Sequence, residues 1–314
     1  MSHKLSLMSL CRFSLYRLFV AAVVVIGCRD RSSLGNIDSA ASKTVSPAVT
    51  GSGSETGWDS AAGPVLIIAA SKTSTDAVII LPGLTDSTLA ATMHFELRGL
   101  ENIPIELFST RGLVGTSSLQ VSSQSVDPAG CVKWPGGTLT GSVAGWTVAL
   151  EKGKASGMPL DSMEGISGPD SAQFVADILK SVQLLTDGGD PAFRGIPFSV
   201  RKGYRLMMPG SSVIIGDAVR RINEEANPRE EHLFLLAERS GNDPAYRVGY
   251  HTRSAGAEEL LETSEILSAL RLTESGRVVM VMTFDYEDGG KIGLLERVAA
   301  NDWRIVWKSA YTDC

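Results

Sequence analysis

The chain has 314 residues, and its 29 lysines and arginines against 35 aspartates and glutamates give a net charge of −6 at pH 7. An acidic chain is not expected to bind nucleic acid, nor to adhere electrostatically to an anionic membrane. A hydrophobic content of 43% and this length suffice for one large or two small globular domains.

The first 27 residues have the layout of a secretory signal peptide. Lys4, Arg12 and Arg17 precede the apolar stretch 18–26, and the segment holds no acidic residue. A membrane-spanning helix needs roughly 20 apolar residues, and this stretch is much shorter. We therefore expect residues 1–27 to be removed as a signal peptide.

The run Val25-Ile26-Gly27-Cys28 closes this segment. It resembles the lipobox of bacterial lipoproteins, in which the preceding segment is cleaved and the cysteine is lipidated. The resemblance implies that Cys28 becomes the N-terminus and carries diacylglycerol on its thiol, often with palmitate on its amine. Two or three acyl chains anchor a protein stably, whereas one does so only marginally. The alternative is a plain secreted protein in which Cys28 is a free thiol.

The same resemblance bears on where the protein lies in the cell envelope. In lipoproteins an aspartate directly after the cysteine can retain the protein at the inner membrane, but here Arg29 follows. This favours the outer membrane, facing the periplasm, in a cell with two membranes. Without residues 1–27, the remaining 287 residues carry 26 basic and 35 acidic groups, a net charge of −9. The lipid is therefore the expected membrane contact.

Residues 28–63 are rich in Ser, Gly, Ala and Thr and have few large apolar side chains. Such a segment buries too little surface to offset the entropy of ordering it. We expect a flexible tether, and about 30 residues of it would reach roughly 30 Å.

Residues 64–195 are predicted to form a β-rich domain that ends in a helix. Short apolar or alternating runs bounded by turn residues indicate strands of an antiparallel sandwich or barrel. The expected strands are 65–68, 77–81, 93–98, 103–108, 113–121 and 146–150. A helix is expected to begin at Pro169-Asp170-Ser171 and to end at Gly188-Gly189.

Residues 196–314 are predicted to form an α+β domain with an antiparallel meander. An alternating strand over 198–208 is followed by an expected second helix over 212–226, which Asn227-Pro228 would end. Residues 257–271 are ambiguous between helix and strand. Turns at 241–244 and 287–290 predict two hairpins, the second through its Asp-Gly pair.

A last strand in this domain places Trp303, Ile305 and Trp307 on one face. The whole chain is thus predicted to be α+β, with antiparallel sheets, two or three helices and two β-rich domains.

Two cysteines remain beyond the lipidation site, Cys131 and Cys314. In an oxidising compartment they form a candidate disulfide, which would close a long loop and stabilise the fold by about 4–5 kcal/mol. Two unpaired buried thiols are the alternative.

The sequence holds no catalytic motif: no nucleophile elbow, no phosphate-binding loop and no zinc-ligand spacing. We predict no catalytic residues, no metal site and no cofactor. The histidines beyond the signal segment, His94, His232 and His251, are expected at the surface.

Other charged and aromatic groups allow both a structural and a functional interpretation. Acidic residues in the loops 161–170 and 285–288 are expected to be solvated, the alternative being calcium ligands or a glycosidase carboxylate pair. Arg220-Arg221 and Glu224-Glu225 are expected to pair on the water-facing side of the second helix, the alternative being a docking face for a charged partner. Trp134, beside Pro135-Gly136-Gly137, is a candidate exposed platform for a sugar or a protein partner.

Together these patterns predict a lipid-anchored envelope protein whose folded part binds a protein or glycan, or acts as a scaffold, without catalysis. The alternative is an envelope hydrolase that acts on glycan or peptide through the loop carboxylates.

Overall fold

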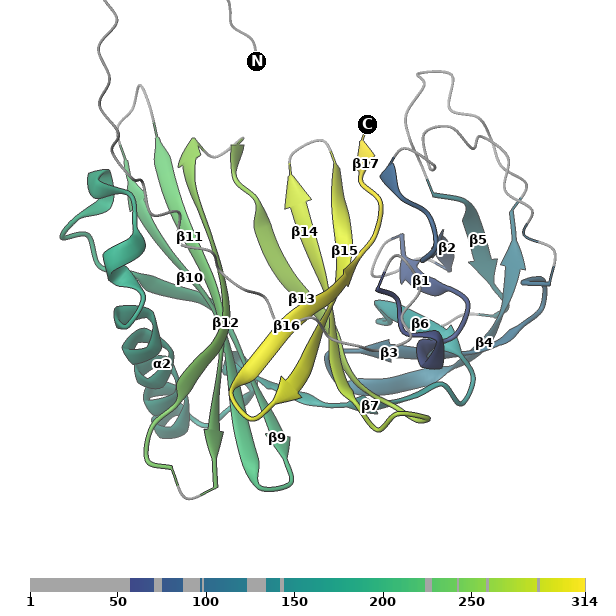
Figure 1. The fold of residues 1–314 in the computed structure, drawn as a ribbon, viewed down its shortest axis with the longest axis horizontal. Helices are drawn as coiled ribbons and strands as arrows, with labels where there is room; N and C mark the ends of the chain where they lie inside the picture. The colour runs from purple at the N-terminus through teal and green to yellow at the C-terminus, as the bar shows by residue number, and fades with distance from the viewer. Residues whose placement is uncertain are drawn as a thin grey trace, which may run out of the picture. The chain divides into compact units, whose positions relative to one another are not determined.

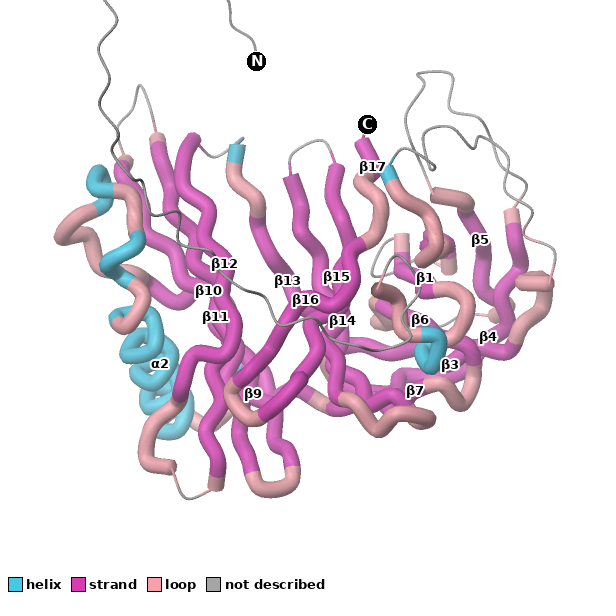
Figure 2. The backbone as a smooth tube through the Cα atoms, in the orientation of Figure 1, coloured by secondary structure: helices cyan, strands magenta, loops and turns pink. Residues whose placement is uncertain are grey.

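Antiparallel strands make up most of the computed structural model (Figure 2). It describes residues 57–313 except 71–74, 87–96, 98, 123–133, 142–143, 224–227, 242, 258–259 and 287–288. Within these residues the one α-helix is α2 (Gly168–Gln183). Short 3-10 turns are η1 (Ser60–Ala62), η2 (Met163–Gly165), η3 (Thr186–Gly188) and η4 (Pro191–Phe193). No helix in the described ranges is long and apolar enough to cross a membrane.

The first strands close into an antiparallel barrel with the order β1-β2-β5-β4-β3-β6. They are β1 (Leu66–Ala69), β2 (Asp76–Ile80), β3 (Pro104–Ser109), β4 (Gly112–Val121), β5 (Gly136–Leu139) and β6 (Val148–Glu151). Side chains alternate in and out along each strand, so Ile67, Ile79 and Ile105 meet in the barrel interior. The predicted antiparallel barrel or sandwich is confirmed here, although β5 was not foreseen.

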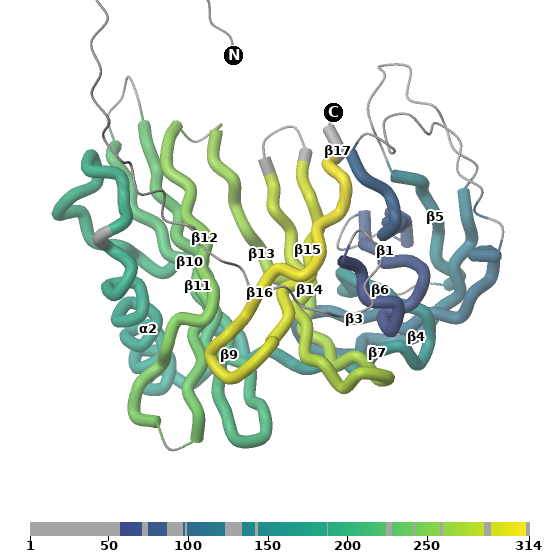
Figure 3. The backbone as a smooth tube through the Cα atoms, viewed as in Figure 1, coloured from purple at the N-terminus to yellow at the C-terminus, as the bar shows by residue number. Residues whose placement is uncertain are grey.

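Two further antiparallel sheets follow. Their strands can be traced along the chain by the residue colours of Figure 3. The helix-side sheet has the order β12-β11-β10-β9-β8 and the barrel-side sheet the order β16-β15-β14-β13-β7, with β17 paired to β15. The first contains β8 (Leu160–Ser162), β9 (Ser199–Met208), β10 (Ser211–Ile222), β11 (Arg229–Ser240) and β12 (Arg247–Ala257). The second contains β7 (Ala155–Met158), β13 (Thr263–Leu272), β14 (Val278–Tyr286), β15 (Gly289–Ala299), β16 (Asp302–Lys308) and β17 (Thr312–Asp313).

Hydrophobic clusters define how these layers pack (Figure 1). Phe174 and Ile178 of α2 cover one face of the helix-side sheet. The other face packs on the barrel-side sheet through a second cluster that includes Phe234 and Met280. A third cluster joins the barrel-side sheet to the barrel.

The N-terminal end of the described chain belongs to that third cluster. Trp58 is buried, and its ring centre lies 4.8 Å from that of Trp307. Residues 58–63, which the sequence assigned to the tether, therefore pack against the folded body. Strands from both sides of residue 195 share sheets, since β7 pairs with β13 and β8 with β9. Division into two domains at that residue stays a prediction.

The predicted α+β class is wrong, because the expected second helix over 212–226 is the strand β10. Val213 and Ile215 point to the barrel-side sheet, whereas Ile214 and Ala218 point to α2. A strand covered on both faces is apolar at nearly every position, so its sequence lacks the alternation that marks a half-exposed strand. The chain is a mostly β protein.

Several local predictions are confirmed. The helix expected from residue 169 is α2, and the strand expected over 198–208 is β9. Antiparallel pairing of β11 with β12 and of β14 with β15 confirms both hairpins. The ambiguous residues 257–271 fall mainly in β13.

Trp303 and Trp307 do not share a face, contrary to the prediction. The pairing of β15 with β16 shifts register between Leu294 and Leu295, which is a β-bulge. Trp303 therefore packs between the two sheets, and Trp307 packs toward the barrel. A single inserted residue reverses the orientation of every side chain beyond it.

Candidate functional site

Charged residues crowd one end of the two adjacent strands β10 and β11. Antiparallel pairing sets Arg220 opposite Glu231 and Arg221 opposite Glu230. Because side chains alternate along a strand, the first pair faces α2 and the second faces the barrel-side sheet. We call these two groups the outer and the inner charge cluster.

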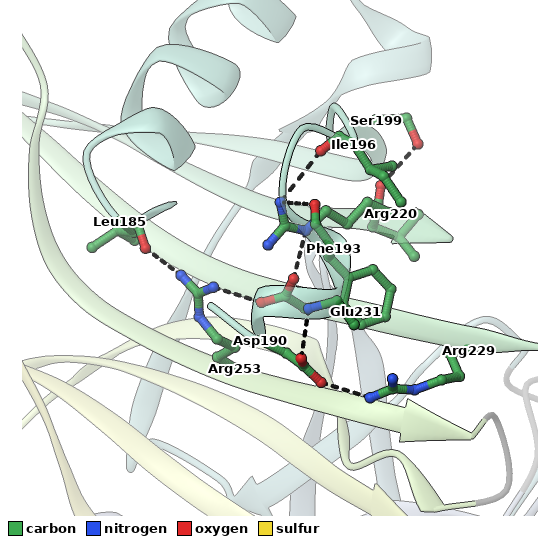
Figure 4. Close-up of polar contacts among 11 residues, drawn as sticks. Leu185, Asp190, Phe193, Ile196, Ser199, Arg220, Arg229, Glu231 and Arg253 are labelled. Carbon is green, nitrogen blue, oxygen red and sulfur yellow. Dashed lines mark hydrogen bonds and ion pairs between the residues drawn. The ribbon is translucent and has the colours of Figure 1, made fainter. Parts of the chain in front are cut away.

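The outer charge cluster contains Arg220, Glu231, Arg253, Asp190 and Arg229 (Figure 4). Glu231 is fully buried and accepts from Arg220 Nε and from Arg253 Nη1, each at 2.5 Å. Two charge-assisted bonds compensate the burial of its carboxylate.

The two arginines extend this cluster to the chain that follows α2. Arg220 Nη1 donates to the carbonyl oxygens of Phe193 (2.9 Å) and Ile196 (3.3 Å), and Arg253 Nη2 donates to that of Leu185. The Arg220 guanidinium also lies 4.5 Å from the centre of the Phe198 ring. These contacts hold the segment 185–198 on the helix-side sheet.

Asp190 and Gly189 complete the outer cluster. Asp190 accepts from the backbone N–H of Ala192 at 2.9 Å and from Arg229 Nη2 at 2.6 Å. The Ala192 N–H, followed by the positive charge of Arg229, holds the pKa of Asp190 below its ordinary value. A Cβ at position 189 would lie 2.5 Å from Arg253 Nη1, so a larger residue there would have to displace that guanidinium.

The inner charge cluster contains His232, Asp217, Glu230, Arg201 and Arg221. His232 Nε2 lies 2.7 Å from Glu230 Oε2, and its Nδ1 lies 3.8 Å from Asp217 Oδ1, which is too long for a hydrogen bond. Arg201 binds Asp217 Oδ2 through Nη2 at 2.5 Å, and Arg221 binds Glu230 Oε1 through Nε at 2.5 Å. Each carboxylate thus has an arginine on its far side.

This arrangement favours a protonated imidazole. Burial alone would lower the pKa of His232, but the carboxylates of Asp217 and Glu230 raise it above the ordinary 6.5. Burial would likewise raise the pKa of Asp217, but His232 and Arg201 lower it below 3.8. Relative to a free histidine, the cluster therefore shifts the equilibrium toward a buried imidazolium–carboxylate pair.

Two small cavities adjoin the inner cluster. One is lined by Asp217, His232, Phe234, Thr252, Arg253, Ser254, Glu262 and Ser264, and its volume is about 10 Å³. The other has a similar volume and is lined by Lys202, Tyr204, Ile215, Asp217, Phe234, Ser264, Glu265 and Ile266. Each has room for about one water molecule, and His232 lines the first of them.

The residues predicted as sites fall mostly elsewhere. Cys28, Cys131, Cys314 and His94 lie outside the described residues. Trp134, the candidate platform, is only 8% exposed and belongs to the cluster between the barrel and the barrel-side sheet. Its ring is part of the core.

Of the other two histidines, His251 is exposed as predicted, whereas the predicted surface position of His232 is wrong. Its alternation with Phe234 and Leu236 along β11 points it inward. In the acidic loop 161–170, Asp161 and Asp170 have local partners, whereas residues 287–288 of the other acidic loop lie outside the described residues. Asp161 lies 3.1 Å from Arg205 Nη2, and Asp170 accepts from Ser167 Oγ at 2.6 Å.

Sequence reasoning missed the inner cluster and misassigned the outer one. Arg220 and Arg221 were expected to pair with Glu224 and Glu225 on a helix, and residues 224–227 lie outside the described ranges. The one available signal was Asp217, an acid inside the apolar run 213–219, because a charge in such a run needs a buried partner.

Comparison with known proteins adds no relative. No family model matches the chain, and no curated protein and no solved structure shows a significant similarity to it. Within the described residues, no group of three or more His, Cys, Asp or Glu side chains is placed to hold a metal ion.

Proposed function

We propose that this chain is a lipid-anchored protein of the bacterial cell envelope, and that its folded β body is a non-catalytic binding or scaffold module. The observation that carries the proposal is the run Val25-Ile26-Gly27-Cys28 after a basic, then apolar segment. Cys28 would carry the lipid, and the acidic chain beyond it offers no electrostatic attraction to anionic lipid.

The position of the body along the chain supports the anchoring part. The packed structure includes Trp58, so a spacer of at most about 30 residues separates it from Cys28. Such a spacer has an r.m.s. reach of roughly 30 Å if it behaves as a flexible coil. That reach lets a folded body stand clear of the lipid surface.

The non-catalytic part is supported by what surrounds the candidate acid–base residues. His232 has carboxylates on both sides, yet the adjoining cavity has room for only about one water molecule. Two of the loop carboxylates on which the hydrolase alternative depends, Asp161 and Asp170, are engaged by Arg205 and Ser167.

Lipid labelling tests the anchor. In a bacterial host fed an alkyne-tagged palmitate, we expect the full chain to be labelled and to sediment with membranes. Cys28→Ser should abolish the label and release the protein, whereas Cys131→Ser, the matched control, should change neither. Unchanged membrane association of Cys28→Ser would overturn the proposal.

Crosslinking tests the binding or scaffold role separately. We expect a photo-reactive residue at exposed positions such as Leu113 or Leu184 to give a discrete crosslinked species in intact cells. The same residue at buried Ile105 is the control. Absence of any discrete species across the exposed positions would count against a binding module while leaving the anchor intact.

A further inference from the structure

The cavity beside His232 is bounded by polar groups from both sheets. Asp217, His232 and Thr252 come from the helix-side sheet, and Ser264 comes from β13 of the barrel-side sheet. Thr252 Oγ1 and Ser264 Oγ lie 3.4 Å apart, which makes a weak contact across the sheets. Four polar groups therefore converge on one small space.

One of these groups lacks a hydrogen bond. The imidazole of His232 is 7% exposed, and its Nδ1 is buried without a hydrogen-bond partner among the described residues. Its other nitrogen, Nε2, already contacts Glu230. A buried polar atom that is left unpaired costs free energy, so native structures rarely leave one without a protein or water partner.

Size and charge restrict what can occupy the space. A volume of about 10 Å³ is near the minimum for one water molecule. The charged and titratable groups on the His232 side of the sheet are Asp217, Glu230, Glu262 and Arg201, whereas the guanidinium of Arg253 lies in the outer cluster. The nearby carboxylates oppose an anion, and the imidazolium opposes a cation, so a neutral ligand fits best.

We propose that this cavity is a specific binding site for one water molecule, which links His232 Nδ1 to Asp217 and to the hydroxyl of Ser264. The water accepts from Nδ1–H when the imidazole is charged, and it can donate to Nδ1 when the imidazole is neutral. Asp217 Oδ1 lies 3.8 Å from Nδ1, and an ionised carboxylate cannot make that second bond. The site thereby ties the two sheets together in either protonation state.

A high-resolution crystal structure of the full chain tests this site. We expect one water within about 2.7–3.2 Å of His232 Nδ1, Asp217 Oδ1 and a hydroxyl of Ser264 or Thr252. A direct Nδ1–Asp217 hydrogen bond beside an empty cavity would overturn the proposal, and so would an ion or an organic group in that place.

Nitrogen NMR of the histidine ring provides a second measurement that does not depend on crystals. Ser264→Ala removes one partner of the water and should shift the ¹⁵N signals of His232. Ser268→Ala is the matched control, since Ser268 is a buried serine of the same strand whose hydroxyl bonds to Ser109 O. Signals of His232 that stay unmoved in Ser264→Ala, or that move equally in both variants, would contradict the bridging water.

Discussion

Arg220 and Glu231 face each other across β10 and β11 with Nε 2.5 Å from Oε2, and their side chains are 7% and 0% exposed. This pair lies in the middle of a sheet and not on a helix surface. Its role is to hold a loop: Glu231 orients Arg220, and Arg220 binds the carbonyl oxygens of Phe193 and Ile196.

Removal of the Glu231 carboxylate, which both arginines share, should therefore strongly destabilise the fold. In Glu231→Ala, Arg220 and Arg253 keep buried charges without compensation, and we expect the free energy of unfolding to fall by about 3–5 kcal/mol. Urea denaturation measures this. Asp243→Ala is the control, because its partner Arg247 is 67% exposed and such pairs contribute at most about 1 kcal/mol. Equal losses in the two variants would contradict the role of Glu231.

The inner cluster predicts a defined pH dependence. A raised pKa for His232 adds stability that is complete below pH 6.5 and is lost as pH rises through the folded-state value. A lowered pKa for Asp217 adds stability that is complete above pH 3.8 and is lost as pH falls. Their joint contribution should thus be greatest between about pH 4 and 6.5.

Urea denaturation of the wild-type chain and of His232→Gln over pH 4–9 measures this contribution as the difference between the two proteins. We expect the difference to shrink as pH rises above 6.5, because only the wild type loses a proton from residue 232. A difference that grows with pH would show that the pKa of His232 is lowered in the fold.

A substitution at Trp134 tests whether this side chain is part of the core or an exposed binding platform. Trp134→Ala should lower the free energy of unfolding by about 3–5 kcal/mol, the usual cost of deleting a large core side chain. Leu184→Ala is the control, since Leu184 is 70% exposed and its change should stay within about 0.5 kcal/mol. A small change in the free energy of unfolding of Trp134→Ala would contradict burial of Trp134 and would favour the exposed platform that the sequence predicted.

Close packing of α2 on β10 depends on a glycine. A Cβ at Gly216 would lie 2.5 Å from Ile178 Cγ2, so Gly216→Ala should destabilise the protein by about 1–3 kcal/mol. Ile178→Ala removes the obstructing atom. We therefore expect the double variant to be more stable than the sum of the two single effects predicts, as a double-mutant cycle measures. Additive effects would show that the destabilisation by Gly216→Ala does not come from contact with Ile178.

The sequence predicted helix α2 and strand β9 well and strand β10 poorly. Helix α2 and strand β9 carry clear periodicities because each has exposed positions among its buried ones. Strand β10 is covered by α2 and by the barrel-side sheet, so its apolar residues fit a helical spacing as well as a strand.

The inner charge cluster could not be predicted from local sequence patterns. His232 and Asp217 meet only because β10 and β11 are neighbours, and the pairing of strands is a tertiary fact that no local pattern contains. Once β10 was assigned to a helix, Arg220 and Glu231 could not be recognised as cross-strand partners.

Mass spectrometry of the mature N-terminus tests the central claim most directly. For the chain purified from bacterial membranes, we predict that the first peptide begins at Cys28 and carries the mass of a diacylglyceryl group on its sulfur. A first peptide that begins elsewhere, or that contains an unmodified Cys28 thiol, would contradict the lipid anchor.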